Sequence, residues 1–390
     1  MDLHEFKAKR LLAGYGIASP EGRVAVTADE AMGAARELSK EPGGAVYVKA
    51  QIHAGDRFTA GGVRKAETPV EARKAANELL GQKLVTPQTG PQGHIVKRVL
   101  VEAAVRAQKE IYLAIMVDAI DASLVVMGGK GGSGIEQRTD SAGLETVSLS
   151  LKGEKKSGDI ADFCKRLGVT GTEAEKLAQT VKNMHRAFVE LDASLIEINP
   201  LAFNEKGEAV ALDAKIVLDD NALFRHPDLA GLREEDEIDE IELKAQQHQI
   251  NFMQMSGDIG VVVNGAGLGL ATLDMLRAAG GTPANFMDIR TTAKSLDIAQ
   301  GIGLVLDNPK VKVILVNVYG GGMQPCDTII EGLGIAFRRK GRVLPLVLRV
   351  TGNNEDIARV RMESFGLPKT LSPDMWQAAS RAVAIARGKA

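Results

Sequence analysis

The chain has 390 residues, enough for two or three domains that each bury their own core. A net charge of −2, with 25% charged and 4% aromatic residues, indicates neither a nucleic-acid partner nor a membrane partner. No run reaches the ~18 apolar residues of a spanning helix, and the N-terminus lacks an apolar leader. Two cysteines, Cys164 and Cys326, cannot build a disulfide framework and match no zinc spacing, so we expect a protein of the reducing cytoplasm.

Helical and strand patterns alternate along the whole chain, which predicts the α/β class. An opening helix comes first, with Leu3, Phe6 and Leu11 on one side. The elements predicted after it are a strand at 23–27, a helix at 29–39, a strand at 45–52, a helix at 71–80, strands near 94–104 and 110–117, and a helix at 172–191. Between the second strand and the second helix lies "HAGDRFTAGG", a loop with three glycines.

Residues 194–215, "SLIEINPLAFNEKGEAVALDAK", predict a hairpin with a polar turn at 204–208. Pairing that is symmetric about Lys206 sets Asn199 opposite Asp213 and Glu197 opposite Lys215, and both pairs share one face. That face must then line a cleft or meet water. The other face is apolar and is predicted to be core: Ile196, Ile198, Val210, Leu212 and Ile216.

The amide oxygen of Asn199 and the carboxylate of Asp213 are hard ligands of the kind that Mg²⁺ takes together with water and phosphate. An ordinary solvated hairpin face is the alternative. Lys49 ends an apolar strand just before the glycine loop, which suits a cation placed over nucleotide phosphates. An exposed lysine at the end of a strand is the alternative there, and the chain has no Walker A sequence.

The acidic run "REEDEIDEIE" at 233–242 indicates a solvated helix or linker at a domain boundary. Beyond it, "DIGVVVNG", "ANFMDI", "VKVILVNV" and "LPLVLRV" read as strands buried on both faces, as in a parallel sheet. From about residue 244 the pattern therefore predicts an open, doubly wound domain. Such domains bind ligands at the carboxyl ends of their strands.

Two strand-to-loop junctions in this half are rich in glycine, "VVVNGAGLGLAT" and "VNVYGGGMQPCD". In the second, Pro325 suits the first turn of a helix whose free N–H groups would form an anion site. Tight packing of a βα turn is the alternative. Gly265, Gly267 and Asp288 imitate a dinucleotide-binding motif, but Leu270 stands where the motif needs a small residue, which disfavours an NAD-dependent oxidoreductase.

The order of motifs resembles the β subunit family of succinate–CoA ligase (succinyl-CoA synthetase). The segments that carry the resemblance are "MDLHEFKAKRLLAGYGI", "VKAQIHAG", "QKLVTPQTGP", "EINPL", "ALDAK", "DDNALFRHPDL", "VNGAGL", "GTPANFMD" and "VNVYGG". The resemblance implies an N-terminal ATP-grasp fold at about 1–238, with a smaller subdomain at about 21–104. It implies a flavodoxin-like domain with a doubly wound parallel sheet at 239–390.

The family forms an acyl-CoA from an acid, CoA and a nucleoside triphosphate through a phosphohistidine on an α subunit, in an αβ or α2β2 assembly. By motif match, Asn199 and Asp213 would bind Mg²⁺, and Glu197 would orient the phosphohistidine. The positions that would form the nucleotide site are Pro20, which the ATP-using members carry, Lys49, Glu102, Val105, Glu110 and the phosphate loop Asp56-Arg57-Phe58. The positions that would bind the acid are Asn264, Gly321, Gly322 and Met323.

Three departures from the family pattern bear on substrate binding. The phosphate loop reads Asp-Arg-Phe-Thr at 56–59 where the family has Gly-Arg-Gly-Lys. Three glycines after "ANFMDI" are replaced by Arg290, Thr291 and Thr292, and the later glycine turn is one residue longer. If the cation and hydroxyls face the acid pocket, they suit a short dianion with a multi-oxygen group, such as sulfoacetate.

If the loop at 290–292 contacts the α subunit instead, succinate remains the expected acid. A non-catalytic relative that has lost turnover is a further alternative, motivated by Asp56 and Phe58. The retention of Lys49, Glu197, Asn199 and Asp213 speaks against it.

Overall fold

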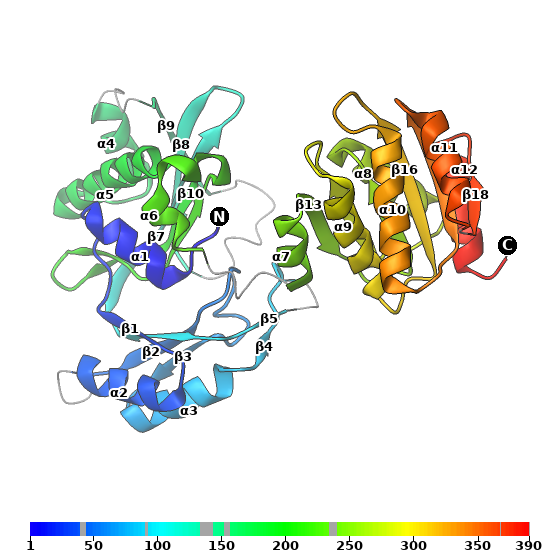
Figure 1. The fold of residues 1–390 in the computed structure, drawn as a ribbon. Helices are drawn as coiled ribbons and strands as arrows, with labels where there is room; N and C mark the ends of the chain where they lie inside the picture. The colour runs from blue at the N-terminus through cyan, green and yellow to red at the C-terminus, as the bar shows by residue number, and fades with distance from the viewer. Residues whose placement is uncertain are drawn as a thin grey trace. The chain divides into compact units, whose positions relative to one another are not determined.

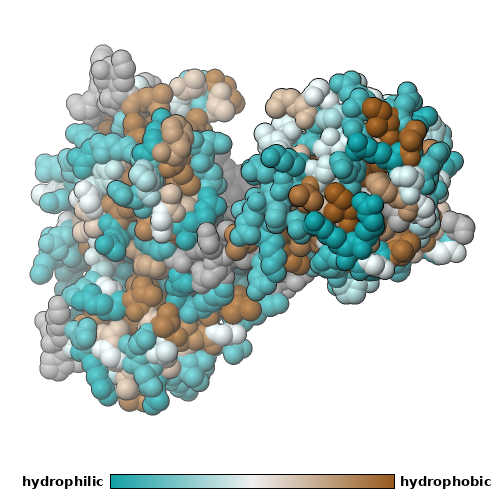
Figure 2. Space-filling view, in the orientation of Figure 1, coloured by the Kyte–Doolittle hydropathy of each residue, from teal (hydrophilic) through white to brown (hydrophobic). Residues whose placement is uncertain are grey.

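A computed structural model describes residues 1–39, 44–89, 93–132, 143–151, 157–233, 240–366 and 368–389. The chain divides into two compact units, Met1–Arg233 and Glu234–Ala390 (Figure 1). Hydrophilic and hydrophobic residues are interspersed on the visible face of each unit (Figure 2). Among the described residues, no helix combines the length and apolar character needed to cross a lipid bilayer.

The first unit contains a small antiparallel sheet in the order β1-β6-β2-β3. Its strands are β1 (Gly22–Ala25), β2 (Val46–Ala50), β3 (Val63–Ala66) and β6 (Val99–Ala103). Two helices, α2 (Ala28–Leu38) and α3 (Pro69–Leu79), pack on this sheet (Figure 1). Each begins at a threonine whose hydroxyl accepts from the third backbone N–H that follows, as N-cap residues do.

A larger sheet in the same unit has the order β11-β10-β7-β8-β9, with β12 also paired to β10. Its strands are β7 (Ala107–Asp118), β8 (Ser123–Lys130), β9 (Glu145–Leu149), β10 (Ala193–Asn204), β11 (Ala209–Ala211) and β12 (Ala214–Leu218). One face buries an apolar cluster against α1 (Glu5–Gly14), α4 (Ser157–Arg166) and α5 (Gly171–Glu190). The short elements of the unit are β4 (Lys83–Leu84), β5 (His94–Ile95), η2 (Asp220–Arg225) and α6 (Pro227–Ala230).

The hairpin has the predicted register. Glu197 pairs with Lys215, and the N–H of Asn199 donates to the carbonyl of Asp213 at 3.2 Å. The residues of the predicted core face are buried, with the exception of Leu212. Leu212 lies between β11 and β12, where it is half-buried and lines a cavity. The strand is interrupted there, so the side chain leaves the alternation that the sequence suggested.

The second unit is a six-stranded sheet in the order β13-β15-β14-β16-β17-β18. The five strands from β14 onward are parallel and follow the 2-1-3-4-5 order of flavodoxin-like folds, as predicted, while β13 adds an antiparallel edge. The strands are β13 (Ile250–Gln254), β14 (Ile259–Val263), β15 (Asn285–Ile289), β16 (Val313–Gly320), β17 (Leu346–Gly352) and β18 (Lys369–Leu371).

Helices cover both faces of this sheet, the arrangement that doubly wound folds require. Residues of α7 (Glu240–Gln247), α9 (Ser295–Asp307), α10 (Cys326–Lys340) and α11 (Glu355–Ser364) join one apolar cluster. Residues of α8 (Ala266–Ala278) and α12 (Met375–Ala386) join another. The glycine turns follow β14 and β16, so both lie at the carboxyl edge of the parallel strands.

Candidate active site

A cavity of about 510 Å³ in the first unit is lined by residues of both sheets. Alternation along β10 explains one wall, because Glu197, between the buried Ile196 and Ile198, points away from the core. Every residue that the sequence suggested for nucleotide, metal or phosphohistidine contacts lines this cavity: Pro20, Lys49, Asp56, Arg57, Phe58, Glu102, Val105, Glu110, Glu197, Asn199 and Asp213.

Two buried lysines, Lys9 and the cavity-lining Lys49, share the same acceptors. Lys9 donates to Glu5 Oε1 at 2.8 Å and to Glu102 Oε1 at 2.6 Å. Lys49 donates to the same two carboxylates, at 2.9 and 2.6 Å. The carbonyl oxygen of Leu212, exposed by the break between β11 and β12, accepts from both ammonium groups at 2.6 Å. Because an ammonium has three N–H donors, a phosphate can reach Lys49 only by displacing one of these acceptors.

Arg57 lies beside the lysines and is itself buried, with 8% of its side chain exposed. One Nη1–H donates to the carbonyl of Ala50 at 2.7 Å. Nη2 donates to Glu5 Oε2 at 2.8 Å and to Asp213 Oδ2 at 2.6 Å. The phosphate loop is therefore tied both to α1 and to the hairpin.

Charges in this cluster balance. Burial alone would raise the pKa of Glu5, but the neighbouring cations Lys49, Lys9 and Arg57 hold it well below its usual range. Burial lowers the pKa of Lys49, and the carboxylates around it more than offset that effect and raise the value. Burial raises the pKa of Glu102, and the charges of Lys49 and Lys9 oppose that effect. By formal charge the cluster holds three carboxylates, Glu5, Glu102 and Asp213, and three cations, Lys9, Lys49 and Arg57.

The backbone of the phosphate loop explains one departure from the family pattern. Asp56 has a φ of +56°, the left-handed region where glycine is the usual residue and aspartate is among the tolerated ones. The loop also receives support from outside, because the N–H of Gly55 donates to Gln88 Oε1 at 2.7 Å. Phe58 is 64% exposed at the cavity, where the family has a glycine. This substitution adds an apolar ring to the cavity wall and leaves the turn intact.

Asn199 and Asp213 form a donor set that fits Mg²⁺. Asn199 Oδ1 accepts from the N–H of Gly132 at 3.1 Å, and Asp213 Oδ1 accepts from the N–H of Ala214 at 2.8 Å, which fixes both side chains. Among the described residues, no group of three or more His, Cys, Asp or Glu side chains is placed to hold a metal. An ion at this pair would therefore keep water or phosphate oxygens in its other positions, as Mg²⁺ commonly does.

Glu197 presents a carboxyl group with altered acidity to the same cavity. Burial raises its pKa, Lys215 opposes that effect and the nearby charge of Asp213 adds to it, so the pKa is above the usual range. Carboxyl groups whose pKa is raised by burial beside a cavity often exchange protons with a bound group or pair with a cation. An imidazole is one group that such a carboxylate can hold.

The residues suggested for the acid lie in the second unit, at the carboxyl edge of its sheet. Asn264 follows β14, and its amide donates to the carbonyl of Tyr319 at 2.7 Å and accepts from the N–H of Tyr319 at 2.8 Å. The turn after β16 includes Gly321, Gly322 and Met323, whose side chain is 73% exposed. The Asn264 amide thus holds the end of β16, just before this turn.

The start of α10 differs from the expectation in one detail. Pro325 is the N-cap residue, immediately before the first turn. The first helical amide, that of Cys326, donates to the carbonyl of Asn353 at 2.9 Å. The number of free N–H groups at this helix end is therefore smaller than the sequence suggested.

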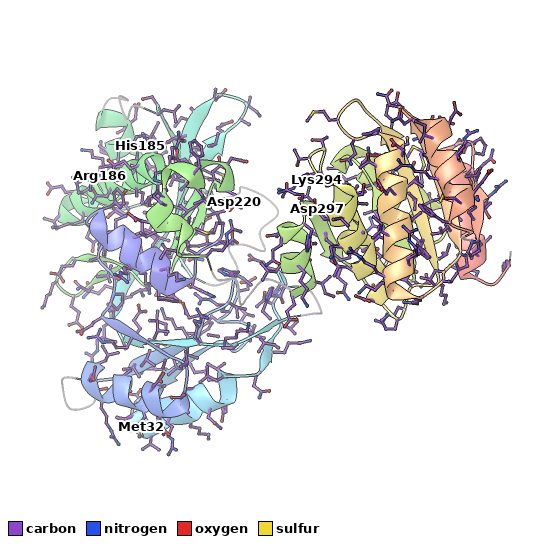
Figure 3. All side chains as sticks on the ribbon, viewed as in Figure 1. Met32, His185, Arg186, Asp220, Lys294 and Asp297 are labelled. Carbon is purple, nitrogen blue, oxygen red and sulfur yellow. The ribbon has the colours of Figure 1, made fainter. Side chains whose placement is uncertain are left out.

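Arg290 is held at the same edge by a row of hydrogen bonds. Its Nε and Nη2 donate to Asn251 Oδ1 at 3.1 and 2.9 Å. The amide of Asn251 donates to Asp288 Oδ2 at 3.1 Å, and Asp288 Oδ1 accepts from the N–H of Gly265 at 2.6 Å. The row fixes the guanidinium relative to the turn before α8 and leaves Nη1 for another acceptor. Lys294 lies just before α9 (Figure 3).

Sequence reasoning missed three residues of the site. Glu5 and Lys9 are four residues apart on α1 and read as an ordinary surface pair of a helix, although both are buried. Gln88 lies in a segment that carried only the family resemblance. The one local signal was the position of Glu5 and Lys9 on the helix, since both share a face with the apolar Leu12.

The comparisons with known proteins agree with this architecture. The model of the ATP-grasp domain matches residues 2–203, and the model of the CoA-ligase family matches residues 262–385. The fold and the cavity thus define an ATP-grasp unit followed by a CoA-ligase unit, the class of the acid–thiol ligases.

Similar curated proteins narrow this class. The chain is 39% identical over 393 residues to the β subunit of the ADP-forming succinate–CoA ligase of Burkholderia thailandensis, with both chains fully covered. It is 40% identical over 401 residues to the corresponding subunit of Acidiphilium cryptum, with 99% of each covered. The chain therefore belongs to the family of β subunits of ADP-forming succinate–CoA ligases.

One solved structure shows the same fold at low sequence identity. ATP citrate lyase from Methanothrix soehngenii superposes with a TM-score of 0.76 at 17% identity, over 99% of each chain. This likeness supports the order of the two units and carries no statement about the substrate.

Proposed function

We propose that this chain is the nucleotide-binding and Mg²⁺-binding subunit of an ADP-forming acid–CoA ligase. The observation that carries the proposal is that one cavity gathers buried cations, two hard oxygen ligands and a carboxyl group of raised pKa. Lys49 and Arg57 would bind phosphate oxygens, and Asn199 with Asp213 would hold Mg²⁺. The metal would neutralise charge on the phosphates during transfer.

The phosphoryl group would pass from ATP to a histidine of an α subunit, in an αβ or α2β2 assembly. The named relatives are β subunits, which supports a partner of this kind. Glu197 would hold the incoming imidazole, because a carboxylate that accepts from one ring N–H fixes the orientation of the ring and leaves the other nitrogen free to accept the phosphoryl group. The carboxylate would also stabilise the positive charge that the ring gains in the transfer. CoA and the acid would then meet at the second unit and its partner.

For the acid we propose a short dianion, with sulfoacetate as the specific candidate. Arg290 supports it, since its guanidinium is fixed at the carboxyl edge of the sheet and retains the N–H donors of Nη1 and the second N–H of Nη2. A guanidinium binds a sulfonate through two parallel hydrogen bonds, which glycine amides at these positions would not provide. Succinate is the second candidate, favoured by the names of the relatives.

The test is acid-dependent and CoA-dependent release of ADP from the chain reconstituted with its α subunit. We expect kcat/KM for sulfoacetate to exceed that for succinate, and Asp213→Asn to lower turnover by roughly 100-fold without unfolding the chain. A kcat/KM for succinate equal to or above that for sulfoacetate contradicts the choice of acid. If none of the short acids supports release of ADP, the proposed function is contradicted.

A further inference from the structure

Arg57 and Asp213 form an ion pair in the cavity, with Nη2 2.6 Å from Oδ2. Asp213 is the more exposed partner, with 38% of its side chain accessible, while Arg57 is buried. Of the ion pairs formed by the described residues, Asp213 takes part in this one alone. The carboxylate proposed to hold the metal is therefore already neutralised by a cation of the protein itself.

Both oxygens of Asp213 accept hydrogen bonds from the protein. Oδ1 accepts from the backbone of Ala214 at 2.8 Å, and Oδ2 accepts from Arg57 at 2.6 Å. A divalent ion that approached Oδ2 would meet the guanidinium charge at close range, in surroundings where the local dielectric screens poorly. The same carboxylate therefore cannot bind both cations at Oδ2.

Arg57 has anchors that do not depend on Asp213. Its Nη1 donates to Ala50, and its Nη2 also donates to Glu5, so the side chain stays in the cavity when the bond to Asp213 is lost. A polyphosphate is a stronger, multidentate acceptor than one carboxylate and can take over the released donor. The geometry thus offers the guanidinium two alternative acceptors, Asp213 or a phosphate.

We propose that Arg57 is an internal competitor for the metal at Asp213. Without nucleotide, the guanidinium occupies the carboxylate and metal binding is weak. With nucleotide, the guanidinium moves to phosphate and Asp213 becomes available, so that metal and nucleotide binding are coupled through one side chain. This inference rests on the proposed function, because it takes Asp213 as a metal ligand.

The test is a titration of the full chain with Mn²⁺ in the absence of nucleotide, with free Mn²⁺ measured by electron paramagnetic resonance. Mn²⁺ takes the same oxygen ligands as Mg²⁺. We expect Arg57→Gln to bind Mn²⁺ at least about 10-fold more tightly than the unmodified chain, because the competing charge is gone. Arg64→Gln is the matched control, since Arg64 lies on β3 in the same unit and forms an exposed ion pair with Glu78 of α3. The affinity of the Arg64→Gln chain for Mn²⁺ should equal that of the unmodified chain.

Equal or weaker Mn²⁺ affinity of a folded Arg57→Gln chain overturns the inference. Asp213→Asn separates this failure from failure of the proposed function: if it leaves Mn²⁺ binding with ATP unchanged, Asp213 is not a metal ligand and both ideas fall. If Arg57→Gln does not fold, crystals of the unmodified chain soaked in Mn²⁺ decide. Anomalous density at Asp213 with Arg57 still in contact then overturns the inference, and its absence without nucleotide supports it.

Discussion

Glu5 is the residue on which the charged cluster depends. Its two oxygens accept from Lys9, Lys49 and Arg57, and one of them also accepts from the amide of Gln51 at 3.2 Å. A buried ion network of this kind adds little stability compared with an apolar core, but removal of one member leaves uncompensated charge. The cluster therefore makes the first helix of the chain a structural part of the cavity.

We expect Glu5→Gln to lower the free energy of unfolding by about 3–5 kcal/mol at neutral pH, since it leaves three buried cations facing two carboxylates. Glu78→Gln, which removes an exposed ion pair in the same unit, should cost no more than about 1 kcal/mol. Urea unfolding followed by circular dichroism measures both. Similar losses for the two variants would contradict the role of the cluster.

The difference in unfolding free energy between the unmodified chain and Glu5→Gln should depend on pH in a defined direction. The folded-state pKa of Glu5 is lowered, so its contribution to stability is present above the ordinary glutamate pKa and is lost as the pH falls through the folded value. The gap between the unmodified chain and Glu5→Gln should therefore narrow in acid. A gap that is constant with pH would show that the glutamine acts through packing instead of charge.

At the scale of elements, the sequence predicted those strands and turns whose structure depends on neighbouring residues. The hairpin register followed from alternation and a glycine-containing turn, and Gly207 has the positive φ that such turns require. The parallel strands of the second unit were evident as apolar runs buried on both faces. These features depend on residues close in sequence, which is why one sequence sufficed.

The strands that were missed lack such a local pattern. The edge strand β13 reads INFMQ, with exposed residues at its end, and β18 has only three residues. β8 has two glycines just before its last residue, which suggest a loop, and β9 is short and partly polar. Pairing with neighbours determines these strands. The charged cluster could not be predicted for the same reason, because Glu5 and Asp213 are far apart in sequence and are brought to Arg57 only by the fold.

Helix α8 offers a comparison between two glycines of one element. A Cβ at Gly269 would lie 2.6 Å from the ring of Phe286 and 3.0 Å from Val263, whereas a Cβ at Gly267 meets nothing within 4 Å. The close packing of this helix on the sheet thus depends on Gly269, one position before Leu270. The dinucleotide motif would need its small residue at 270, which is 59% exposed.

We expect Gly269→Ala to destabilise the second unit by roughly 1–3 kcal/mol, since the ring must move to admit the methyl group. Gly267→Ala should be neutral or stabilising by up to about 1 kcal/mol, because alanine favours the helix and has space. Thermal unfolding of the two variants measures the difference. A larger loss for Gly267→Ala would show that the helix does not pack as described.

At the scale of the whole molecule, each unit has its own core. Every apolar cluster formed by the described residues draws its members from one unit only. The cavity is built entirely within Met1–Arg233. A ligand that fills it adds contacts to that unit alone, so its effect on stability should be confined there.

Calorimetry of the full chain should therefore show two unfolding transitions, of which Mg·ATP raises one. A ligand at 100 times its dissociation constant stabilises the state that binds it by about 2.7 kcal/mol, enough for a clear shift. Glu5→Gln should lower the same transition and Gly269→Ala the other, which assigns each to its unit. NAD serves as the control ligand and should shift neither. A single transition whose midpoint temperature rises with Mg·ATP would contradict the prediction of two independent units, because it would mean that the two units unfold as one cooperative body.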